Sequence, residues 1–207
     1  MFLGTAAWAI EEPDYTVLKT DKSFELRAYQ PMIIAEVKVS GDMKQASSRG
    51  FKLIADFIFG NNTATNGESS KISMTKPVSM ESQKTDPRSE EISMTVPVTM
   101  EQSTGQDNDS WWVHFVMPSE YTLETLPKPN NERVKIRQID ETNYAVIKFS
   151  GFTGDEKVKR KISELLQWMA NEEIIPTGSP ELARYNPPIT PPFFRRNEVM
   201  VKYKKEG

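Results

Sequence analysis

"FELRAYQPMIIAEVKVSG", residues Phe24–Gly41, is written a second time in the chain in altered form. The segment "VKIRQIDETNYAVIKFSG", residues 134–151, aligns with it without a gap, 110 positions later (134 − 24). The arginine, alanine, lysine, serine and glycine at five aligned positions are identical, and each copy runs directly into a predicted helix. Internal similarity of this kind predicts two related halves packed about a pseudo-twofold axis.

Strands are predicted within and beyond the two copies. In residues 24–40, Ala35, Val37 and Val39 alternate with charged residues, which is the pattern of a strand with one buried face, and Pro31 interrupts it. The same reasoning predicts strands in residues 110–118, 134–150 and 199–203.

One helix is expected after each copy. Asp42 is a suitable N-cap for a helix that ends near Phe59, before Gly60, and the second helix is expected from Asp155 to about Glu172.

A shorter repeat, "KISMTKPVSME" (71–81) and "EISMTVPVTME" (91–101), predicts two more half-buried strands. A polar turn separates them, so they are expected to pair as antiparallel neighbours. Pro77 and Pro97 cannot donate a ladder hydrogen bond, so each marks an edge, a bulge or a strand end. The predicted fold is therefore α+β: a distorted antiparallel β-barrel of two pseudo-twofold-related βαββ halves, with two long helices packed outside.

Composition excludes several classes of function. Residues 10–207 are expected to form a single domain, a monomer by default, with no run long enough to span a membrane. The net charge is −3 and the basic residues are scattered, so nucleic acid is not an expected partner. With no cysteine, one histidine and no catalytic or phosphate-binding motif, the sequence gives little support for an enzyme or a metal site.

Several residues that could bind a metal or take part in catalysis are better explained by structural or solvent-exposed roles. His114, in an apolar strand without a second histidine, is expected to be a structural or surface histidine rather than a metal ligand. Glu36, Glu81 and Glu101 are expected to be solvated charges on an exposed face, and the methionines of the repeats to fill the core rather than bind a flat ligand or iron.

The N-terminus leaves the compartment open. Ala7-Trp8-Ala9 has the small-x-small pattern of a signal cleavage site, so residues 1–9 are interpreted as a signal-peptide remnant and the protein as periplasmic or exported. A frayed terminus of a cytoplasmic protein is the alternative.

The first helix carries a second apolar patch. Phe51, Ala55 and Phe59 fall just outside the arc expected to face the sheet, and Lys44, Ser48 and Lys52 flank them. A planar apolar ligand bearing carboxylates would suit both the rings and the lysines. A loop around residues 61–70 or the proline-rich tail folding over the patch is the alternative.

Together these motifs resemble the SOUL or heme-binding protein family over nearly the whole chain. The resemblance is carried by "EEPDYTVL" (11–18), "FELRAY" (24–29), "GFKLIADFIFGNN" (50–62), "FVMPSEYTLETLP" (115–127), "ARYNPP" (183–188) and "RRNEVMV" (195–201). It implies a barrel of two βαββ halves, related to gyrase-inhibitor-like small-molecule-binding domains. It also implies non-covalent binding of heme or another tetrapyrrole near the first helix.

The resemblance implies specific roles for residues of this chain. The porphyrin would lie on Phe51, Ala55 and Phe59. Some members of the family have an iron-ligating histidine where this chain has Ala28, which implies binding by apolar and ionic contacts alone. Lys44, Arg49 and Lys52 would contact the propionates, and Ser48 stands where a basic residue can occur.

Three functions remain in view. The leading one is a non-catalytic tetrapyrrole carrier or buffer. The others are a gyrase-inhibitor-like domain with hydrolase activity on a lipophilic compound, for which Glu81 and Glu101 are the residues to test, and a ligand-free interaction protein.

Overall fold

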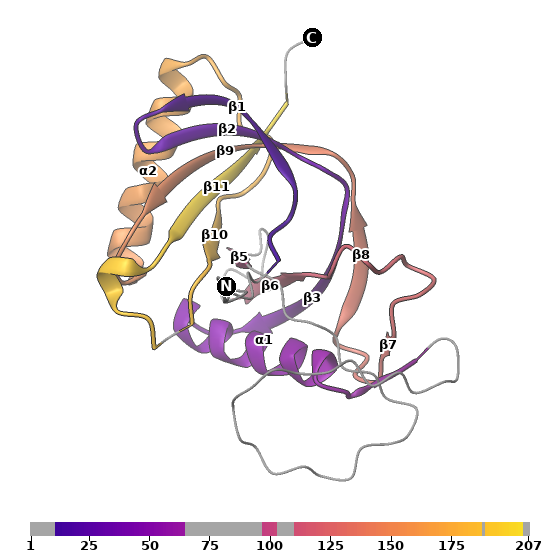
Figure 1. Cartoon of the computed structure of the whole chain (residues 1–207). Helices are drawn as coiled ribbons and strands as arrows, with labels where there is room; N and C mark the ends of the chain where they lie inside the picture. The colour runs from indigo at the N-terminus through magenta and orange to yellow at the C-terminus, as the bar shows by residue number, and fades with distance from the viewer. Residues whose placement is uncertain (1–10, 65–96, 103–109, 188, 205–207) are drawn as a thin grey trace, which may run out of the picture.

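The computed structural model of the chain describes residues 11–64, 97–102, 110–187 and 189–204. They form a nine-stranded antiparallel sheet that curls into a half-barrel, with two helices against it (Figure 1). The strand order is β1-β2-β9-β11-β10-β5-β6-β3-β8. The strands are β1 (Tyr15–Asp21), β2 (Phe24–Tyr29), β3 (Met32–Ser40), β5 (Val98–Gln102), β6 (Ser110–Val116), β8 (Lys135–Ile139), β9 (Thr142–Phe149), β10 (Glu181–Arg184) and β11 (Asn197–Tyr203).

Two helices, a 3₁₀ turn and a second, smaller sheet complete the described structure. The helices are α1 (Met43–Ile58) and α2 (Asp155–Asn171), and η1 (Pro192–Phe194) is a single 3₁₀ turn. A separate two-stranded sheet pairs β4 (Asn62–Thr63) with β7 (Lys128–Pro129). Among the described residues, no helix has the length and apolar character needed to span a membrane.

The two aligned sequence segments adopt the same order of elements. The first contains β2 and β3 and leads into α1, whereas the second contains β8 and β9 and leads into α2. Gly41 and Gly151, which are aligned, have φ angles of 114° and 97°, a left-handed conformation that glycine adopts without strain. The predicted α+β barrel-like fold is thus confirmed, although the sheet formed by the described residues does not close, because β1 and β8 are its two edges.

Edge strand β1 contains an irregularity. Its register against β2 shifts between Val17 and Lys19, which places a bulge at Leu18.

The helices cover different parts of one face of the sheet. α1 packs on β3 and β6, and α2 packs on β9 and β11. Alternation directs Ala35, Val37 and Val39 toward this face, as predicted, and all three join the main hydrophobic core. The indole of Trp168 in α2 stacks on Phe24 with ring centroids 4.9 Å apart.

Helix α1 begins and ends where the sequence predicts. The carboxylate of Asp42 accepts a hydrogen bond from the backbone N–H of Gln45 at 2.8 Å and so caps the first turn. Gly60 follows the helix with a φ of 116°. At Gly50 the helix approaches the sheet so closely that a Cβ atom there would lie 2.5 Å from Cγ2 of Val113.

The predicted pairing of the two methionine-proline repeats is wrong for the part of the second repeat that the structure describes. Val98 to Glu101 of β5 pair with β10 on one side and with β6 on the other, so both edges are taken. Met100 fills the core, as predicted, with 1% exposure. The first repeat, with Glu81, and the proposed signal segment 1–9 lie outside the described residues.

Candidate functional site

The outward face of α1 carries an apolar patch, which we call the helix patch: Phe51, Ala55 and Phe59. Burial of Gly50, Ile54 and Phe57 against the sheet turns this patch toward solvent. Phe51 and Phe59 remain 42% and 44% exposed, and Ala55 between them is 8% exposed. The ring of Phe51 rests on the buried ring of Phe115 in β6, with centroids 5.5 Å apart. Two phenylalanine rings of the patch are therefore partly exposed, and one of them rests on the core.

Polar residues predicted to flank the helix patch divide into two groups. Lys44, Ser48 and Lys52 are exposed and share the patch face by helical periodicity. Arg49 instead extends toward the start of the helix, where its guanidinium donates to the Ser40 carbonyl at 3.3 Å and to Oε1 of Gln45 at 3.2 Å. Two lysines are thus available to carboxylates of a ligand on the patch.

Ala28, at the position of the family's axial histidine, does not belong to this surface. It lies in β2, between β1 and β9, whereas α1 packs on β3 and β6. His114 is also directed elsewhere: it is 7% exposed, and its Nε2 lies 3.6 Å from Oε2 of Glu36. Burial lowers the pKa of His114 to about 4, against the opposing effect of Glu36, so the imidazole is neutral at pH 7. The imidazole is thus buried in the sheet beside Glu36.

The face of the sheet opposite the helices holds a buried ionic network. Arg27 is fully buried and donates to Glu25 and Tyr29, and to both carboxylate oxygens of Glu198 at 2.8 and 3.0 Å. Burial alone would raise the pKa of Glu198, but the bonds from Arg27 outweigh it and the pKa is lowered. The network joins β2 to β11 across β9, and we interpret its role as structural.

The acids predicted to be solvated are less exposed than expected. The carboxylate of Glu36 is 12% exposed and pairs with Arg137 at 2.8 Å. Glu101 lies directly opposite Glu181 across β5 and β10. Burial raises the pKa of Glu181, which accepts a hydrogen bond from the Tyr144 hydroxyl at 3.2 Å and pairs with Lys202 at 3.1 Å. Alternation places Glu36 and Glu101 on the polar side of their strands, but it cannot show which neighbouring strands supply their partners.

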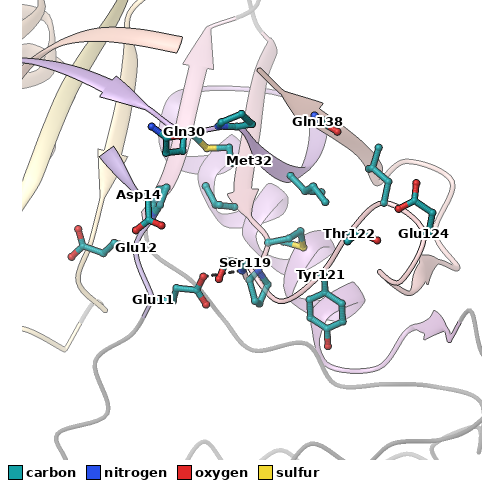
Figure 2. Close-up of a pocket in the computed structure, with 17 residues that line it drawn as sticks. Glu11, Glu12, Asp14, Gln30, Met32, Ser119, Tyr121, Thr122, Glu124 and Gln138 are labelled. Carbon is teal, nitrogen blue, oxygen red and sulfur yellow. Dashed lines mark hydrogen bonds between the residues drawn. The ribbon is translucent and has the colours of Figure 1, made fainter. Parts of the chain in front are cut away.

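A separate pocket of about 330 Å³ lies at the end of the sheet where β3 begins and β6 ends. Three segments far apart in the sequence line it together with Gln138 of β8: residues 11–14, the turn at 30–33 and the loop at 116–124 (Figure 2). A hydrogen bond at 2.8 Å from the backbone N–H of Ser119 to Oε1 of Glu11 joins two of these segments. Sequence analysis did not identify this pocket, because no local pattern links the segments that line it.

A protein-family model matches most of the chain. The model described as SOUL heme-binding protein matches residues 10–90 and 82–202. A comparison with curated proteins gives no match.

Solved structures with a similar fold are distant in sequence. The C-terminal domain of EcmrR is 10% identical, with a TM-score of 0.60 over 93% of this chain and 99% of that domain. A hydrolase from Listeria innocua is 15% identical, with a TM-score of 0.55 over 90% of this chain and 94% of that one. An uncharacterized conserved protein from Listeria innocua is 15% identical, with a TM-score of 0.56 over 88% and 93%. At these identities the similarity establishes the fold.

Proposed function

The chain belongs to the SOUL heme-binding protein family, and we propose that it is a non-catalytic tetrapyrrole carrier whose ligand lies on the helix patch. The observation that carries this proposal is the exposure of Phe51 and Phe59, at 42% and 44%, on a helix whose opposite face is buried. A flat porphyrin would cover both rings and remove their apolar surface from water.

Charge supports the same ligand class. The exposed ammonium groups of Lys44 and Lys52 flank the helix patch on the helix surface, where they can pair with the two propionates of a heme or porphyrin. The chain as a whole carries a net charge of −3, whereas these two lysines place positive charge beside the helix patch.

Binding on the helix patch would not use a histidine ligand. The chain has one histidine, and His114 is buried in β6 beside Glu36. We therefore propose that apolar and ionic contacts supply the affinity, and that the iron contributes little. Metal-free protoporphyrin IX should then bind about as tightly as hemin.

The test is an absorbance titration of the purified chain with hemin and with protoporphyrin IX. We expect a saturable Soret change with both. Phe51→Asp should weaken binding by about tenfold or more, because it removes an aromatic contact worth roughly 1.5–3 kcal/mol. Lys52→Glu should weaken it several-fold through the lost propionate pair.

Matched controls separate the helix patch from general surface effects. Phe152→Asp alters a phenylalanine that is 66% exposed outside α1, and Lys159→Glu alters an exposed lysine of α2. Both should bind like the wild type. Phe59→Asp is the second patch variant, since the Phe51 ring also contacts Phe115. Equal weakening by patch and control variants, or no saturable change with either ligand, would rule out the proposal.

A further inference from the structure

The pocket of Figure 2 is independent of the helix patch, because none of its seventeen lining residues belongs to α1. Part of its lining is apolar. Met32 and Ile33 from β3 and Val116 and Met117 at the end of β6 contribute to it, and Leu123, 47% exposed, stands at its edge. A volume of about 330 Å³ suits a small organic molecule rather than a porphyrin.

The polar lining of this pocket is acidic. Four carboxylates line it, from Glu11, Glu12, Asp14 and Glu124, and the lining contains no lysine, arginine or histidine. Figure 2 shows the first three on one side of the pocket and Glu124 on the other. A ligand in the pocket would therefore lie between negative charges.

Among the described residues, one of these carboxylates is paired with a cation. Glu12 pairs with Arg196 through both carboxylate oxygens, at 3.0 and 2.9 Å, although Arg196 also pairs with Glu198, and Glu11 accepts the backbone N–H of Ser119. Counted over the described part of the chain, four carboxylates and this arginine leave a net charge of about −3 (+1 − 4) at the pocket. A hydrogen bond from Thr122 lowers the pKa of Glu124, which keeps that group ionised at pH 7.

The carboxylates do not form a metal site. Among the described residues, no group of three or more histidine, cysteine, aspartate or glutamate side chains could hold a metal ion. The charges instead lie on two sides of a pocket that apolar side chains also line. This arrangement fits an extended cation whose charge is joined to an apolar body, since the body contacts methionine and leucine while the charge meets the carboxylates.

We infer that this pocket is a binding site for a small organic cation, such as an aryl or alkyl ammonium compound. Its charge is opposite in sign to that beside the helix patch. Propionates would therefore be repelled from the pocket and attracted to the helix patch. The chain would thus bind ligands of opposite charge at two separate surfaces.

Phenyltrimethylammonium is a suitable probe, and tert-butylbenzene is its neutral counterpart of the same shape. Protein carrying ¹³C-labelled methionine methyl groups reports binding directly, because Met32 and Met117 line the pocket and can be assigned with Met32→Leu and Met117→Leu. We expect a saturable shift of these two methyl signals with the cation, a weaker shift at higher salt, and a much weaker response to tert-butylbenzene.

Variants of the carboxylates decide the origin of the selectivity. Asp14→Asn and Glu124→Gln should each lower the affinity for phenyltrimethylammonium by about two- to fivefold, as expected for exposed ion pairs. Glu120→Gln, in the same loop but outside the pocket lining, should leave binding unchanged, and so should Lys52→Glu on the helix patch. Equal binding of the two probes, equal weakening by Glu120→Gln, or the absence of a saturable shift would overturn the inference.

Discussion

At the scale of single residues, Gly50 shows packing overriding intrinsic helix propensity. In a helix interior, alanine is more favourable than glycine by about 1 kcal/mol. A Cβ at position 50, however, would lie 2.5 Å from Cγ2 and 2.7 Å from Cβ of Val113, and the Cβ cannot move by rotation of the side chain. We expect Gly50→Ala to lower the free energy of unfolding by about 1–3 kcal/mol in urea titrations.

Ser48→Ala, on the exposed face of the same helix, is the control for Gly50→Ala. It should change stability by less than about 0.5 kcal/mol. If Gly50→Ala proved more stable than the wild type, α1 would not approach β6 as closely as described.

His114 predicts a pH dependence of stability. Its pKa is about 4 in the folded chain, below the ordinary value of 6.5, because burial, Lys202 and Arg137 outweigh the nearby carboxylate of Glu36. Between these values the unfolded chain binds a proton that the native chain does not, so stability falls as the pH is lowered from 6.5 toward 4. From pH 7 to pH 5 this amounts to about 2 kcal/mol.

Urea titrations at pH 7, 6 and 5 on the wild type and on His114→Gln test this expectation. The variant should lack most of the loss, since glutamine does not titrate. Parallel pH profiles of the two proteins would show that His114 is not the group responsible.

At the scale of elements, the pair of Arg27 and Glu198 connects strands that are not neighbours. Both side chains are fully buried, so removing one leaves the other charge without its main partner. Glu198→Ala should cost about 3–5 kcal/mol in the free energy of unfolding. Arg137→Ala breaks an ion pair with Glu36 in which the arginine is 51% exposed, and should cost less than about 1 kcal/mol. Similar losses for the two variants would contradict a structural role for the network.

The elements that sequence analysis predicted are those with strong local patterns. Both helices and the strands at 24–40, 110–118, 134–150 and 199–203 were recognised from periodicity, caps and prolines. β1 was missed because, as an edge strand with exposed residues throughout its middle, it has no alternation. β10 was missed because it has four residues.

The pairing of β5 shows why strand neighbours are hard to predict from local sequence. Similar composition and a polar turn favour pairing of the two methionine-proline repeats, but long-range contacts with β6 and β10 determine where Val98–Gln102 lie. Local sequence does not encode such a choice of neighbour.

At the scale of the whole molecule, the two candidate sites differ in how far sequence could predict them. The helix patch lies on one element, so helical periodicity alone placed Phe51, Ala55 and Phe59 on one side of it, where both phenylalanines are exposed and Ala55 is buried. The pocket depends on the fold, because residues 11–14 meet the loop at 116–124 only after the sheet has formed. Its carboxylates were unremarkable in sequence.

In the part of the chain that the structure describes, β1 and β8 are strand edges without a second neighbour, and such edges can template intermolecular sheet formation. Both edges here carry features that oppose it. Leu18 bulges from β1 next to Lys19, and β8 exposes Lys135 and Arg137 at its surface. A second copy adding its own strand would meet a distorted ladder on one side and like charges on the other. The sheet can therefore remain open without promoting aggregation.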